Sequence, residues 1–200
     1  MKKRIVLLAA VMSLILTGCG GVSRAGEQDG ETLDAALVEE APRSLTQTEV
    51  LSAYDRAVTA YGWFDLSPLP CGQEEEIVDG WTYQKVDYPG IEDLADLRAY
   101  LRVVFSQELT DRLLTRGERP VYQDLDGALY AAAGTGREKE SDKGSVTVEV
   151  RQESETVYSV EVTVELLDST RSTVIGVESY SFPYEFQDGS WVFTDFQLVY

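Results

Sequence analysis

Residues 157–167 read VYSVEVTVELL, a stretch in which Val160, Val162 and Val164 alternate with polar side chains. Strict alternation is the pattern of a β-strand that buries one face and exposes the other. The same period of two recurs in residues 145–150, 174–183 and 191–199. The second half of the chain is therefore predicted to be a set of β-strands.

Two Asp-Gly dipeptides predict how these strands connect. Asp126-Gly127 lies between Val121-Tyr122 and Leu129-Tyr130, and Asp188-Gly189 lies between two aromatic-rich segments, residues 184–186 and 191–193. Asp-Gly favours the two-residue turns that join antiparallel strands. We therefore expect two β-hairpins, one before the alternating segments and one that joins the last two of them.

The first half has helical spacing instead. Thr46 and Glu49 have the spacing of a capping box, and apolar residues then follow a helical period until Gly62, where the helix is expected to end. Residues 91–115 also carry an apolar stripe, with Ser106 as the expected N-cap of a second helix within them. Helices followed by antiparallel strands predict an α+β fold.

The segment between these helices holds the candidate contact residues. Residues 63–80 contain prolines and glycines and are expected to be irregular, whereas residues 81–86 alternate like a strand. Three consecutive acids, Glu74, Glu75 and Glu76, are followed by Asp79. Because no apolar period buries them, we expect these four carboxylates to protrude in a loop.

The N-terminus has the form of a bacterial lipoprotein signal. Three basic residues precede an apolar run that ends in Leu16-Thr17-Gly18-Cys19, which matches a lipobox. We expect cleavage before Cys19, lipidation of its thiol, and anchoring at the extracytoplasmic face of the cell membrane. Residues 1–18 are then the signal peptide, 19–45 a flexible acidic tether, and 46–200 a single α+β domain.

Composition narrows the function classes. The chain has 35 acidic and 17 basic residues, a net charge of −18 and no histidine. This charge disfavours nucleic acid, and the lack of histidine excludes histidine-based catalytic triads and metal sites. Cys71 has no second thiol to pair with once Cys19 is lipidated, and Gly134-Thr135-Gly136-Arg137 is expected to be a loop without the Lys-Ser/Thr pair of a phosphate-binding motif. We expect no enzymatic activity, no cofactor and no metal.

The order of these elements resembles the DL-endopeptidase inhibitor family, the IseA-like proteins, over residues 46–200. The helix pair before the Tyr122–Tyr130 hairpin segment, Tyr-Gln-Asp-Leu-Asp-Gly-Ala-Leu-Tyr, carries most of the resemblance. It implies two lobes with a cleft and inhibition of NlpC-type cysteine peptidases that cut peptidoglycan stem peptides. It also implies that an acidic loop docks on the basic active-site groove of the peptidase. The lipid anchor departs from the secreted members and would confine inhibition to the membrane-proximal wall.

Charge and placement in this sequence, rather than matched family positions, select the partner-binding residues. We expect Glu74, Glu75, Glu76 and Asp79 to form the acidic contact, with Trp81 and Tyr83 as aromatic anchors. The expected partner is a cell-wall DL-endopeptidase. One alternative is a cystatin-like or NTF2-like ligand-binding lipoprotein, which would have an apolar pocket instead of an acidic surface. A structural envelope protein without a definable site is another.

Overall fold

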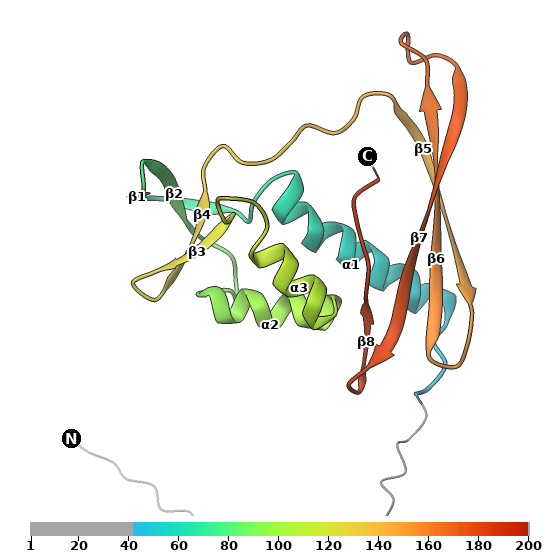
Figure 1. Ribbon diagram of the computed structural model, residues 1–200, viewed down its shortest axis with the longest axis horizontal. Helices are drawn as coiled ribbons and strands as arrows, with labels where there is room; N and C mark the ends of the chain where they lie inside the picture. Colours follow the sequence, from blue (N-terminus) through green and yellow to red (C-terminus); the bar gives the residue numbers. More distant parts are fainter. Residues whose placement is uncertain (1–41, 200) are drawn as a thin grey trace, which may run out of the picture. The chain divides into compact units, whose positions relative to one another are not determined.

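A computed structural model describes residues 42–199. The predicted signal peptide, Cys19 and the predicted tether up to residue 41 lie outside these residues. The described part has three helices and two four-stranded antiparallel sheets (Figure 1), which confirms the α+β class. Leu45 is tied to the second half of the chain, because the Tyr158 hydroxyl accepts a hydrogen bond from Leu45 N and donates one to Leu45 O.

Helix α1 spans Gln47–Asp65 and begins with the predicted capping box. The Thr46 hydroxyl accepts a hydrogen bond from Glu49 N, and the Glu49 carboxylate accepts one from Thr46 N. The prediction that the helix ends at Gly62 is wrong, because Trp63 and Phe64 continue it and are buried in the core. Their burial outweighs the cost of about 1 kcal/mol for a glycine inside a helix.

Helices α2 (Leu94–Val104) and α3 (Gln107–Leu114) lie within the segment predicted to be helical. The predicted break is confirmed, since the Ser106 hydroxyl caps α3 by accepting a hydrogen bond from Leu109 N. The predicted start at residue 91 is too early: Asp93 is the N-cap of α2, and Ile91 forms an isolated bridge with Tyr88.

The first sheet has the strand order β1-β2-β4-β3. It consists of β1 (Cys71–Val78), β2 (Trp81–Val86), β3 (Tyr122–Leu125) and β4 (Ala128–Ala132). Strand β2 and the hairpin of β3 and β4 were predicted. Strand β1 corrects the expectation of an irregular segment, because Asp79-Gly80 forms the turn of a third hairpin that aligns Glu75 with Gln84 and Val78 with Trp81.

The second sheet has the order β5-β6-β7-β8, with β5 at Lys143–Gln152, β6 at Val157–Leu167, β7 at Val174–Gln187 and β8 at Ser190–Phe193. The strand predicted for residues 191–199 ends early. Its last part leaves the sheet because the Phe196 ring packs in the core, 4.7 Å from the Phe182 ring centroid and 5.7 Å from that of Tyr54.

One face of the first sheet lies on the main hydrophobic core. Tyr122, Leu129 and Ala131 from this face are buried with residues of α1, α2, α3 and the second sheet. The opposite face, here called the outer face, has its own small apolar cluster of Tyr83, Tyr130 and Ala132. Strand alternation thus presents one face of this sheet to the core and leaves the other for the candidate site.

Candidate functional site

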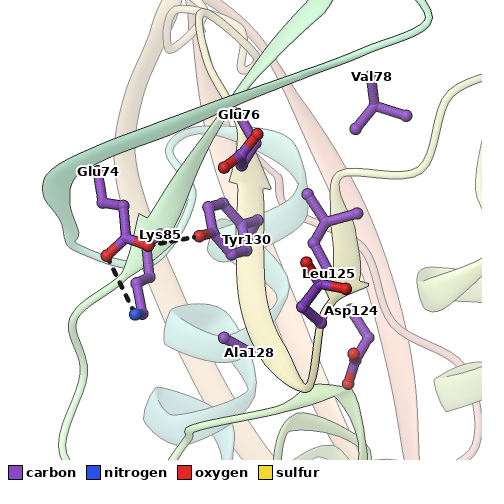
Figure 2. A pocket seen from close by; sticks show the side chains of 9 residues that line it. Glu74, Glu76, Val78, Lys85, Asp124, Leu125, Ala128 and Tyr130 are labelled. Carbon is purple, nitrogen blue, oxygen red and sulfur yellow. Dashed lines mark hydrogen bonds and ion pairs between the residues drawn. The ribbon is translucent and has the colours of Figure 1, made fainter.

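The outer face of the first sheet carries an open hollow of about 530 Å³. Side chains from all four strands of the sheet, and from the turn between β3 and β4, line it (Figure 2). The following residues line it: Glu74, Glu76, Val78, Lys85, Asp124, Leu125, Asp126, Ala128 and Tyr130. Four carboxylates and one ammonium group therefore share the hollow, so it is suited to cationic groups.

Glu74 forms hydrogen bonds with residues of two other strands in this hollow. Its carboxylate accepts a hydrogen bond of 2.9 Å from the Tyr130 hydroxyl and one of 3.1 Å from Lys85 Nζ, and Figure 2 shows it between the two. The hydrogen bond from Lys85, and then that from Tyr130, lower the pKa of Glu74. Burial and the neighbouring Glu74 carboxylate raise the pKa of Tyr130. Glu74 is therefore a charged, positioned group of the sheet and not a free loop carboxylate.

The other predicted acids are less engaged. Glu75 and Glu76 are exposed on β1, and alternation directs Glu76 to the outer face and Glu75 to the opposite face, where it accepts a hydrogen bond of 2.8 Å from Gln84. Asp79 is exposed in the turn with φ of 52°. The expected loop cluster is thus divided between a strand edge and a hairpin turn, because a β-strand sends neighbouring side chains to opposite faces.

The two predicted aromatic anchors differ in exposure. Trp81 is 54% exposed, whereas Tyr83 is 1% exposed and can only support the outer face from within. The Arg119 guanidinium lies over both rings, 4.3 Å from the Trp81 centroid and 5.4 Å from that of Tyr83. The Tyr83 hydroxyl accepts a hydrogen bond from Gln123 Nε2. Arg119 therefore covers one end of the outer face, and the hollow occupies the other.

Sequence reasoning missed Lys85, Tyr130, Asp124 and Asp126 as parts of this site. Asp126 had been noted only for the turn that it forms. The hairpin of β1 and β2 was detectable, because Asp79-Gly80 is the dipeptide that predicted the two other hairpins. The pairing of β2 with β4, which brings Lys85 opposite Tyr130, joins segments far apart in the chain and has no local signal.

The acidic lining of the hollow can bind positive charge. Between residues 42 and 199 no group of three or more His, Cys, Asp or Glu side chains could hold a metal ion. Cys71 is half-buried, and its thiol donates a hydrogen bond of 3.2 Å to the Leu69 carbonyl oxygen. Burial raises the pKa of this thiol. A raised pKa makes the thiol a poorer nucleophile.

No helix of the described residues has the length and apolar character needed to cross a membrane. A comparison of the chain with protein-family models finds no matching family, and a comparison with curated proteins finds no matching relative.

Proposed function

We propose that this domain binds a basic surface of a cell-envelope protein, and that it thereby inhibits a peptidoglycan DL-endopeptidase of the NlpC type. The observation that carries the proposal is the hollow of the outer face, where Glu74, Glu76, Asp124 and Asp126 surround a single cation, Lys85. Lys85 is paired with Glu74, and no cation among residues 42–199 forms an ion pair with Glu76 or Asp126. Asp124 accepts a hydrogen bond from Gly127 N and keeps its negative charge toward the hollow.

The chemistry of such a surface suits protein recognition better than capture of an apolar ligand. An open, acid-lined hollow steers a basic partner and gives an association rate that falls with salt. The ligand-binding alternative calls for an enclosed apolar pocket with a few polar groups. Trp81, which is 54% exposed on the same face of the sheet, supplies an aromatic side chain of the kind that anchors protein interfaces.

Inhibition assays with graded salt test the proposal. The protein should inhibit a DL-endopeptidase of its own envelope at low ionic strength and lose affinity as salt rises. The informative variant is Glu76→Gln, Asp124→Asn and Asp126→Asn together, which removes three carboxylates of the hollow and leaves Glu74 and its hydrogen bonds in place. Inhibition should weaken about tenfold if the three carboxylates together contribute about 1.4 kcal/mol.

A matched control is available on the second sheet. Glu149→Gln, Glu153→Gln and Asp188→Asn remove the same number of charges from exposed positions, and Asp188 occupies an equivalent hairpin turn with φ of 50°. These substitutions should leave inhibition unchanged. If the unaltered protein inhibits no NlpC-type peptidase of the same envelope, the proposed function is rejected. Equal losses in both triple variants would reject this site while keeping the function.

A further inference from the structure

Strand β1 forms an edge of the first sheet and pairs only with β2. In an antiparallel ladder, every second residue directs its N–H and C=O groups away from the partner strand. The outward groups of β1 therefore have no strand partner within residues 42–199. Such an edge is a template for another strand, and proteins usually block it with short length, proline, lysine or a covering segment.

The side chains of β1 favour pairing with basic strands over pairing with acidic ones. Ile77 is a large apolar side chain that is 74% exposed, and Glu74, Glu75 and Glu76 precede it. Pairing with β1 of a second copy would set carboxylates against carboxylates, which is unfavourable across strands. A strand with positive side chains would instead form opposite-charge pairs and could cover Ile77.

The other edges of the two sheets lack this combination. β3 is only four residues long, and β8 is a short strand that packs against α2. β8 pairs only with the end of β7, so the first part of β7 is also an edge with exposed Ile175 and Val177, but its one acid, Glu178, is already paired with Lys143. β5 is long, but its side chains include both signs, with Lys143 and Arg151 as well as Glu149. Preference for a basic strand is therefore a property of β1.

We propose that β1 accepts an extended lysine- or arginine-bearing segment of a partner protein as a fifth strand of the first sheet. This inference rests on the proposed function for the partner's identity and adds the mode of recognition. Backbone hydrogen bonds to β1 would provide affinity, and alternate side chains would provide specificity. Positive side chains on one face would meet Glu76 beside the hollow, and those on the other face would meet Glu75 next to Ile77.

A pair of synthetic peptides tests the strand pairing directly. The probe alternates lysine with threonine and valine, and its control has the same sequence with N-methyl groups on the backbone nitrogens that would face β1. Both peptides carry the same charge, but only the first can donate hydrogen bonds to the edge. The first should slow amide hydrogen exchange in β1, and N-methylation should weaken binding about tenfold. Equal binding of both peptides, or protection of β5 in place of β1, would overturn the proposal.

Substitutions in β1 and β5 test whether the charge of this edge, rather than the overall charge of the protein, determines peptide binding. Glu75→Gln with Glu76→Gln should weaken peptide binding about fivefold, whereas Glu149→Gln on β5 should leave it unchanged. Equal weakening by both would contradict recognition at β1. Peptide binding at β1 without peptidase inhibition would uphold the strand-accepting edge and reject the peptidase as target. Peptidase inhibition without protection of β1 would keep the peptidase as target and reject the strand-accepting edge.

Discussion

Arg137 Nε donates a hydrogen bond of 2.9 Å to Asp65 Oδ2, and this contact ties the segment that follows the first sheet to the last residue of α1. Arg116, just beyond α3, approaches the other oxygen of the same carboxylate at 3.3 Å. The Asp65 side chain is only 12% exposed. One largely buried carboxylate therefore connects the end of α1, the segment after α3 and the segment after β4.

Replacing Asp65 with asparagine should therefore destabilise the domain. The variant keeps the shape of the side chain but removes the largely buried negative charge that Arg116 and Arg137 share at this position. We expect a loss of about 1.5–3 kcal/mol in the free energy of unfolding, the range for hydrogen bonds to charged groups. Chemical denaturation measures it. Asp111→Asn is the control, since Asp111 pairs with Arg98 in a more exposed setting and should cost less than about 1 kcal/mol.

Gly136 should tolerate no side chain, because this loop passes close to the end of α1. A Cβ at this position would lie 2.0 Å from the carbonyl oxygen of Leu66, and φ is +119°. Gly136→Ala should cost at least about 2 kcal/mol of unfolding free energy. At Gly134, φ is +68° but no atom lies within 4 Å of such a Cβ, so Gly134→Ala should cost only about 1 kcal/mol. Equal costs in thermal or chemical unfolding would contradict the close approach.

The capping box of α1 should make the stability of the fold depend on pH in the acid range. The hydrogen bond from Arg43, with those from the Thr46 backbone and hydroxyl, lowers the pKa of Glu49 from 4.5 to about 2. A carboxyl whose pKa is lower in the folded state contributes its full stabilisation above about pH 4.5 and loses it as the pH falls toward 2. Glu49→Gln should therefore lower stability at neutral pH and flatten the loss of stability across that range.

Unfolding curves at several pH values check the role of Glu49. Glu108→Gln is the comparison, because Glu108 lies in the first turn of α3 but outside the N3 position of a capping box. A pH profile of Glu49→Gln that is parallel to that of the unaltered protein would refute the assignment.

Membrane attachment is a prediction from the sequence alone. Cys19→Ala should release the protein from the membrane fraction or leave an uncleaved precursor, because no thiol remains to receive the lipid. Fractionation and mass measurement of the product test this. Cys71→Ala removes the other cysteine and should leave attachment unchanged. A mutant at residue 19 with unchanged mass and membrane partition would exclude lipidation there.

The features that the sequence predicted correctly depend on residues close together in the chain. The box of Thr46 and Glu49, the cap at Ser106 and the turn at Asp126-Gly127 each join groups at most a few residues apart. Their hydrogen bonds and backbone preferences are local, so they form in whatever larger structure surrounds them. The same locality allowed the alternating valines of β6 to indicate a strand.

What only the tertiary structure decided depends on residues that meet from distant segments. Burial of Trp63 carries α1 past Gly62, and packing of Phe196 ends β8, although each local pattern predicted otherwise. Glu74 lies beside both Lys85 and Tyr130 because β1 pairs with β2 and β2 pairs with β4, a strand more than forty residues further along the chain. Such contacts depend on which faces of the elements are buried together, and the free energy of that burial is a property of the whole core.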